Sequence, residues 1–241
     1  MEGGRAAWEY AATVTAMPWL NRVPPGDGHP VMVFPGLGAS ERSTQTLREY
    51  LARLGYAVHD WGLGRNRPVP GVLEACRERV LEVAAQHGRK VSLVGWSLGG
   101  VYARELAKQL GPQTRCVITL GSPFSGDTRA TNVTRAYALM GGRRPRPDPQ
   151  RAAQLRRAPE LPTTSIYSRS DGVVAWQCSL NDAAPHTENV EIHASHLGLG
   201  VNPLALYIVA DRLRQDPARW QRFDAQPVPH WLVRSGMQAA H

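Results

Sequence analysis

The chain has 241 residues, 42% of them hydrophobic, which is enough to bury one substantial core and too few for a second large domain. We therefore predict a single domain over residues 1–241. The formal net charge of +8 comes from 28 basic residues, 26 of them arginine, which are scattered along the chain. Charge spread in this way does not predict a nucleic-acid partner.

Cysteine usage and hydropathy bear on the compartment. Cys76, Cys116 and Cys178 are odd in number and have neither disulfide-like nor metal-like spacing, so a reducing compartment is the simplest expectation. The first residues include Glu2 and Glu9 and lack an unbroken apolar core, which does not fit a secretory signal. No apolar run is long enough to span a bilayer. We expect a cytoplasmic protein.

Short apolar strands and amphipathic helices alternate along most of the chain. A helix over residues 4–17, ended by Pro18, comes first. Strands are then expected over residues 31–34, 57–61, 90–94, 116–120, 163–168 and 189–194, and helices over residues 47–54, 71–87, 98–110 and 203–214, the last one capped by Asn202. The first strand is almost continuously apolar, as in a parallel sheet buried on both faces. We predict an α/β fold with a mainly parallel sheet of about six strands and helices on both faces.

Residues 127–162 break the alternation. A helix near residues 131–140, a glycine-rich connector and a second short helix before Pro159 are expected there. This insertion is a candidate lid over an active site, hinged at its double glycine, or a fixed cap. With a net charge of +5 over residues 125–162, its arginines either contact an anionic substrate or membrane surface or form a solvated face. The tail over residues 217–241 is expected to pack across the surface.

The central predicted strand runs into Gly95-Trp96-Ser97-Leu98-Gly99, and a helix follows at once. A G-x-S-x-G sequence between a strand and a helix is typical of a nucleophile elbow, in which a serine on a strained turn exposes its hydroxyl at the end of a sheet. The glycines stand where a side chain would collide with a neighbouring element. Because so short a pattern also occurs by chance, Ser97 needs an acid and a base downstream.

Two later loops supply these groups. A serine nucleophile requires a base within hydrogen-bond reach and a carboxylate that orients the base. Asp171 and His196 each lie in the loop immediately after a predicted strand, so both should reach the same sheet edge as Ser97. The competing acids, Asp127 and Asp182, lie in less favourable segments. Of the competing bases, His193 falls within the last predicted strand and His186 in the loop before it.

Four stretches of the chain form a set: Gly95-Trp96-Ser97-Leu98-Gly99-Gly100, Pro35-Gly36-Leu37-Gly38, Ser168-Arg169-Ser170-Asp171-Gly172-Val173-Val174 and Ser195-His196-Leu197-Gly198-Leu199-Gly200. Together they resemble the α/β-hydrolase superfamily, particularly its small bacterial lipase-like and esterase-like members, over about residues 29–214. The resemblance implies a Ser97, His196, Asp171 triad and hydrolysis of a carboxylic ester through an acyl-enzyme. It also implies an oxyanion hole made by the backbone N–H groups of Leu37 and Leu98.

The substrate is less defined than the chemistry. Pro35 stands where many lipases have a histidine before the oxyanion glycine, and the first two strands of the full fold are missing from the pattern. We expect a small-molecule ester with an apolar acyl group. Aromatic residues near the predicted edge are candidates for its pocket or for the core: Trp61, Trp96, Phe124, Tyr137 and Trp176. Arg65 or Asn66 either reaches this pocket or belongs to an ordinary turn.

Other functions fit the same residues. An acyltransferase or a thioesterase would use the same triad, and a non-catalytic member of the superfamily would bind a small ligand or a partner protein. Haloalkane dehalogenation is disfavoured because in this fold it uses an aspartate at the elbow. The sequence has no metal-ligand spacing, P-loop or dinucleotide fingerprint, so we expect no metal and no cofactor.

Overall fold

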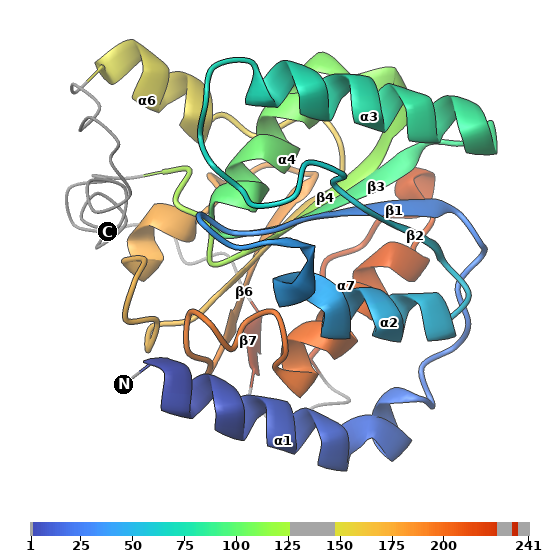
Figure 1. Cartoon of the computed structure of the whole chain (residues 1–241), viewed down its shortest axis with the longest axis vertical. Coiled ribbons are helices and arrows are strands. Elements are labelled where there is room, and N and C mark those ends of the chain that lie inside the picture. The colour runs from blue at the N-terminus through green and yellow to red at the C-terminus, as the bar shows by residue number, and fades with distance from the viewer. Residues whose placement is uncertain (1, 126–147, 226–232, 236–241) are drawn as a thin grey trace.

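A seven-stranded sheet crosses the molecule, and the computed structural model describes residues 2–125, 148–225 and 233–235 (Figure 1). The strands lie in the order β2-β1-β3-β4-β5-β6-β7, and all neighbours are parallel except β6 and β7. Their bounds are β1 (Pro30–Phe34), β2 (Ala57–Asp60), β3 (Val91–Trp96), β4 (Thr114–Leu120), β5 (Thr163–Tyr167), β6 (Thr187–Ile192) and β7 (Val233–Ser235). The predicted mainly parallel sheet is confirmed.

The strand that the sequence did not predict is β7, which lies in the C-terminal tail. It runs antiparallel to β6, with Val233 opposite Ile192 and Ser235 opposite Val190. Three residues with no apolar alternation around them carry too little pattern to predict a strand. They form one here because the edge of β6 offers unpaired backbone N–H and C=O groups.

Helices cover both faces of the sheet. Figure 1 shows α3 and α4 on one face, and α2 and α7 on the other, with α1 outside α7. The helices are α1 (Glu2–Leu20), α2 (Gln45–Arg53), α3 (Val72–His87), α4 (Leu98–Gln109), α6 (Pro149–Arg156) and α7 (Pro203–Arg214), with short 3-10 turns over Glu41–Thr44, Gly111–Gln113, Trp176–Ser179 and Pro217–Arg219.

Burial on both faces is clearest in β1. Val31 and Val33 pack in the layer of α2 and α7, whereas Met32 and Phe34 pack in the layer of α3 and α4, and each is at most 1% exposed. Burying a side chain of this size contributes roughly 1.5–3 kcal/mol. The continuous apolar run and the parallel pairing therefore have one cause, since both faces of the strand are covered by helices.

Helix α1 is longer than predicted. The sequence analysis ended it before Pro18, but the helix continues through this proline to Leu20. A proline inside a helix removes the hydrogen bond to the carbonyl four residues earlier, here that of Val14. Val14 is 57% exposed, so solvent can replace the lost donor. The prediction of a helix end at this point was therefore wrong.

The remaining boundaries follow their capping residues. Asn202 caps α7 by accepting hydrogen bonds from the backbone N–H groups of Leu204 and Ala205, as predicted. Asp148 caps α6, which is the short helix expected before Pro159. The predicted helix near residues 131–140 and the double glycine after it lie outside the described residues.

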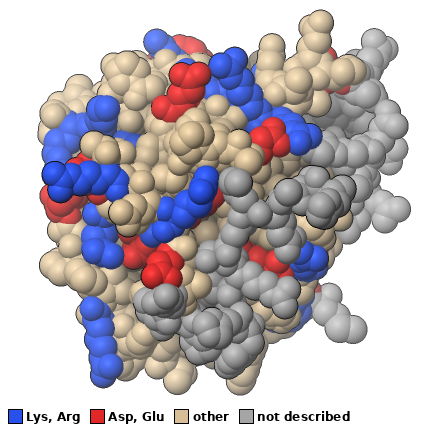
Figure 2. Space-filling view, turned by 180° about the vertical axis from the view of Figure 1, so that it is seen from behind, with Lys and Arg blue, Asp and Glu red and all other residues tan. Residues whose placement is uncertain are grey.

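Basic and acidic side chains are intermingled on the face seen in Figure 2. Several arginines are paired with carboxylates, for example Arg156 with Asp182 at 2.6 Å and Arg212 with Glu188 at 3.2 Å. The residues coloured in that view form no continuous basic surface. In the part of the chain that the structure describes, no helix combines the length and apolar character needed to cross a membrane.

Candidate active site

Ser97 occupies the single position between β3 and α4. Its φ of 54° makes it the one non-glycine residue with positive φ among those described. Side chains rarely adopt this conformation because the Cβ atom crowds the backbone, and such strain persists only where the surroundings enforce it. Here the Ser97 N–H donates to the Leu120 carbonyl at 2.8 Å, and the Ser97 carbonyl accepts from Gly100 N–H at 3.0 Å. These two backbone hydrogen bonds hold the serine in its strained conformation.

The glycines around Ser97 allow backbones to touch. A Cβ atom on Gly95 would lie 2.4 Å from the Gly100 Cα, and one on Gly99 would lie 2.4 Å from the Phe34 carbonyl oxygen. Neither distance leaves room for a carbon atom. The motif thus requires glycine because α4 packs directly against the ends of β3 and β1.

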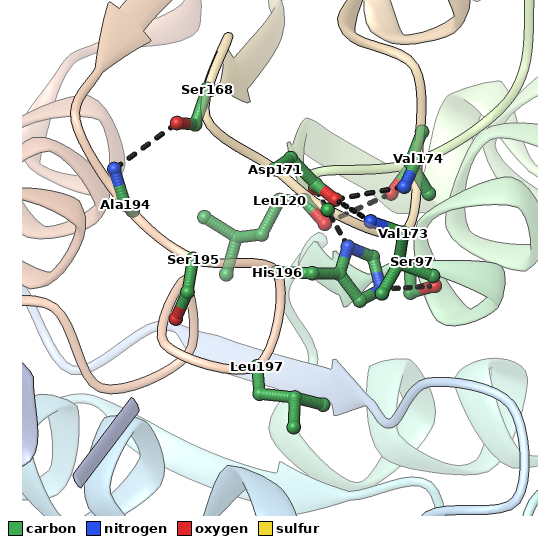
Figure 3. Close-up of polar contacts among 12 residues, drawn as sticks. Ser97, Leu120, Ser168, Asp171, Val173, Val174, Ala194, Ser195, His196 and Leu197 are labelled. Atoms are coloured by element: carbon green, nitrogen blue, oxygen red, sulfur yellow. Dashed lines mark hydrogen bonds and ion pairs between the residues drawn. The ribbon is translucent and has the colours of Figure 1, made fainter. Parts of the chain in front are cut away.

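The structure brings Ser97, His196 and Asp171 into one hydrogen-bonded chain (Figure 3). His196 Nε2 lies 3.1 Å from Ser97 Oγ, and His196 Nδ1 lies 2.7 Å from Asp171 Oδ2. The serine follows β3, the aspartate lies in the loop after β5 and the histidine lies in the loop after β6. Because the ends of parallel strands meet at one sheet edge, these loops are neighbours despite their distance in sequence.

Hydrogen bonds to Oδ1, the oxygen that does not face His196, orient the Asp171 carboxylate. Oδ1 accepts hydrogen bonds from the backbone N–H groups of Val173 and Val174, both at 2.8 Å (Figure 3). Oδ2 therefore faces His196. A carboxylate can only accept, so His196 carries its proton on Nδ1 and leaves the Nε2 lone pair for the Ser97 hydroxyl. This is the tautomer that a general base needs.

Two contacts behind the imidazole were not predicted. Gly121 has a φ of +53°, and a Cβ atom there would lie 2.6 Å from Leu199 Cδ1 and 3.1 Å from Asp171 Oδ2. Trp96 donates its indole N–H to the His196 carbonyl at 3.0 Å. A glycine directly after β4 was visible in the sequence, but the residues that surround it lie some 50 and 80 positions away.

The candidate oxyanion-hole donors belong to two segments that adjoin Ser97. Leu98 is the first residue of α4, where helical N–H groups have no acceptor within the helix. Leu37 lies in the loop after β1, and this loop backs onto the nucleophile, because a Cβ atom on Gly36 would be 3.2 Å from the Ser97 Cβ.

Asn66 is hydrogen-bonded to the loop after β1, which carries Leu37. It is fully buried, its side-chain amide donates to the Pro35 carbonyl at 2.7 Å, and its backbone exchanges hydrogen bonds with Gly38 and Ala39. Arg65 donates to the Gly38 carbonyl at 2.8 Å. Of the two alternatives left open for Asn66, the pocket and the ordinary turn, the burial of its side chain against backbone favours the turn.

Two of the candidate pocket aromatics are packing residues. Trp61 is 1% exposed in the core beneath α3, and its indole donates to the Gly64 carbonyl. Of the two alternatives predicted for Trp61, pocket or core, this burial favours the core. Phe124 is 2% exposed and lies 3.7 Å beneath the buried Arg104 guanidinium.

The other aromatics lie closer to the catalytic loops or outside the description. Trp96 contacts His196 with ring centroids 5.7 Å apart. Trp176 stacks on Tyr167, the last residue of β5, at 5.9 Å. Tyr137 lies outside the described residues. Trp96 and Trp176 therefore stay candidates for contact with a substrate.

The competing acid and base candidates lie elsewhere. Asp182 is engaged by the Arg156 side chain, and His186 precedes β6 at the opposite sheet edge. His193 is exposed and follows β6, so its predicted place within the strand was wrong by one residue. Asp127 lies outside the described residues.

A second Asp-His-Ser chain exists at the opposite end of the strands, where β1 and β3 begin. His29 Nδ1 lies 2.5 Å from Asp27 Oδ1, and His29 Nε2 lies 2.8 Å from Ser92 Oγ. Both His29 and Ser92 are 0% exposed, and Ser92 lies within β3 without backbone strain. No substrate can reach this serine. Hydrogen-bond distances alone therefore do not distinguish the two chains, whereas the backbone conformation of Ser97 does.

Buried histidines also make stability depend on pH. Burial lowers the pKa of His29, although its hydrogen bond to Asp27 opposes the shift. Burial likewise lowers the pKa of His59, and the adjacent His87, 2.9 Å away, adds to the effect. Both imidazoles are therefore harder to protonate in the folded protein than in the unfolded chain.

We expect the free energy of unfolding to decrease as the pH falls from about 7 to about 5. The contribution of His29 and His59 is complete above the unfolded-state pKa of about 6.5 and is lost as the pH drops towards the lower folded-state values. The buried His29 contributes a slope of at most about 1.4 kcal/mol per pH unit. Urea midpoints at about pH 7.5 and about pH 5.5 measure the change. His59→Gln should flatten it, and a midpoint that is constant or rises at the lower pH contradicts the prediction.

Comparison with known proteins assigns the chain to a family. Residues 31–241 match the model of the alpha/beta hydrolase family. The chain belongs to this family, and the resemblance in its four motifs is thereby confirmed. No curated protein sequence matches the chain.

Several solved structures have the same fold. Lipase B of Aspergillus fumigatus superposes with a TM-score of 0.60 at 18% identity, over 80% of this chain and 54% of its own, so the present chain spans about half of that enzyme. A mature lipase of Bacillus licheniformis has a TM-score of 0.60 at 15% identity, over 79% and 94% of the two chains. An alpha/beta superfamily hydrolase from Oenococcus oeni has a TM-score of 0.57 at 19% identity, over 77% and 91%.

Proposed function

We propose that this alpha/beta hydrolase cleaves carboxylic esters through an acyl-enzyme on Ser97, with His196 as general base and acid and Asp171 as the residue that orients it. The observation that carries the proposal is the hydrogen-bonded chain of these residues on a strained serine at the strand end. The Aspergillus fumigatus and Bacillus licheniformis proteins are lipases, which is consistent with an ester substrate.

In the first half-reaction the Ser97 oxygen attacks the ester carbonyl carbon while its proton passes to His196 Nε2. Negative charge develops on the carbonyl oxygen, where the N–H groups of Leu37 and Leu98 would stabilise it. One such donor is typically worth a factor of about 10²–10³ in kcat. The C–O bond then breaks, the alcohol takes the proton from His196, and the acyl group stays on Ser97.

The second half-reaction reverses the roles. His196 removes a proton from water, and the resulting hydroxide attacks the acyl carbonyl. When the bond to Ser97 breaks, the serine oxygen recovers its proton from His196 and the carboxylic acid leaves. Asp171 keeps its charge throughout and stabilises the imidazolium that forms in each half.

A p-nitrophenyl ester series from acetate to palmitate tests the proposal, together with labelling by a fluorophosphonate. We expect hydrolysis and labelling of Ser97, with the preferred chain length reporting the size of the acyl pocket. If the wild type is inert towards every ester and takes up no label, the ester-hydrolase proposal fails. If an added alcohol or thiol outcompetes water as acyl acceptor, the enzyme is a transferase.

Asn66→Ala should lower kcat/KM about 10-fold, because the Pro35 carbonyl loses its donor and the loop that carries Leu37 shifts. The buried carbonyl left without a partner should also cost about 1–3 kcal/mol of stability. Kinetics with a soluble ester and a urea midpoint separate the two effects. An unchanged kcat/KM would mean that this side chain does not position the loop.

A further inference from the structure

Helix α1 is built with its charged face inward. Its charged residues, Glu2, Arg5 and Glu9, recur with Thr13 at spacings of three or four, so they lie along one side of the helix. Glu9 is 8% exposed and Thr13 is 0% exposed. The large exposed residues of the helix are instead uncharged: Trp8, Tyr10, Val14 and Trp19. We call Glu2, Arg5, Glu9 and Thr13 the polar face of α1.

Near the N-terminus of α1, the polar face is hydrogen-bonded to the loop that carries Asp171. Arg5 donates to the Ser170 carbonyl at 2.7 Å and to the Ser170 hydroxyl at 2.8 Å. Glu2 accepts from the Gly172 N–H at 3.1 Å. The residues on both sides of Asp171 are therefore bonded to the same helix.

The same face holds the loop that carries His196. Glu9 Oε1 accepts from the Ser195 N–H at 2.7 Å, and the second oxygen of Glu2 accepts from the Leu197 N–H at 3.2 Å. These two residues flank His196 in the chain. One turn further along, Thr13 donates to the Val201 carbonyl. The loop that carries Asp171 and the loop that carries His196 are thus both hydrogen-bonded to α1.

Two glycines of the catalytic loops are shaped to this support. A Cβ atom on Gly198 would lie 1.7 Å from Glu9 Oε2, and one on Gly172 would lie 2.7 Å from Glu2 Oε1. Neither glycine has a positive φ. They are therefore required for close approach of the helix rather than for backbone conformation.

We propose that the polar face of α1 positions the Asp171 and His196 loops relative to one another, with Glu9 as the principal positioning residue. The proposal rests on the proposed function of these two residues. The contacts of Glu2, Arg5 and Glu9 lie one residue away from Asp171 or His196, so a shift of the helix moves the imidazole relative to Ser97 Oγ. Misplacement of a catalytic group by about 1 Å costs up to about 10² in rate.

Glu9→Leu removes the acceptor of the Ser195 N–H, whereas Glu9→Gln keeps an oxygen there. We expect Glu9→Leu to lower kcat on a soluble p-nitrophenyl ester about 10- to 100-fold with little change in KM, and Glu9→Gln to retain most of the activity. Val14→Ala, on the exposed side of the same helix, is the matched control and should behave as wild type. If Glu9→Leu lowers only the melting temperature, with kcat at a much lower temperature unchanged, the proposal is wrong.

Gly198→Ala tests the same contact from the loop side. The added methyl group would strike Glu9 Oε2, so this substitution alone should also lower kcat. Glu9→Ala removes the closer of two collisions, since Ser195 Oγ would still lie 2.6 Å from the added carbon, so the double variant should be more active than Gly198→Ala. A double variant that is worse than both single variants would contradict a direct contact between Glu9 and Gly198.

A readout independent of turnover separates this proposal from the proposed function. The proton shared by His196 Nδ1 and Asp171 should give a downfield NMR resonance, which Glu9→Leu should shift or broaden and Val14→Ala should not. If the wild type neither hydrolyses esters nor reacts with a fluorophosphonate, the proposed function fails, and the resonance still decides the positioning role. A resonance identical in Glu9→Leu and wild type overturns the positioning role alone.

Discussion

Ser97→Ala is expected to lower kcat for ester hydrolysis about 10⁴-fold or more, whereas Ser92→Ala should leave kcat nearly unchanged. Each serine hydroxyl is hydrogen-bonded to a histidine that is itself hydrogen-bonded to an aspartate. Only Ser97 lies on a strained turn at the strand end, next to the candidate oxyanion-hole donors. Ser92 is buried within its strand, so its loss can reduce stability but removes no nucleophile.

The pair of variants is informative because each controls for the other. Steady-state kinetics on one soluble ester, with circular dichroism to verify folding, give the comparison. Fluorophosphonate labelling should disappear in Ser97→Ala and persist in Ser92→Ala. Comparable loss of kcat in both folded variants would show that the reaction does not depend on the elbow.

Asp171→Asn is expected to be nearly as damaging, with a loss of about 10⁴-fold in kcat, although the side chain keeps its shape. The reason is the pair of N–H donors from Val173 and Val174, which hold one side-chain oxygen of residue 171. In the asparagine variant the amide oxygen must take that position. Its NH₂ group then faces His196 Nδ1 and donates to it, which forces the imidazole proton onto Nε2.

An imidazole with its proton on Nε2 cannot accept the proton of Ser97. The variant should therefore fold with a near-normal melting temperature, bind substrate with a similar KM and fail in the chemical step. Nitrogen-15 shifts of His196 would report the switched tautomer directly. Retention of more than about a tenth of wild-type kcat would mean that this carboxylate does not set the tautomer.

Much of the fold could be predicted because its signals are local. The apolar run of β1, the G-x-S-x-G turn and the Asn202-Pro203 helix start each specify an element within a few residues. Parallel pairing then has a geometric consequence, since loops that follow different strands converge on one edge. The G-x-S-x-G motif nominated Ser97, and this rule then nominated Asp171 and His196 and preferred them over Asp182 and His186.

The tertiary structure decided what depends on residues far apart in the chain. No pattern near Glu9 shows that it bonds to the loop beside His196, some 187 positions later, or that Gly198 is a glycine for that reason. The buried Asn66 looked like a turn residue because its partners belong to another loop. The sequence by itself determined the order of strands and helices and the chemistry available at their ends. Packing alone decided which buried polar groups lie beside the loops of the candidate site, as Asn66 and Glu9 do, and which, like His29 and Ser92, lie at the opposite end of the strands.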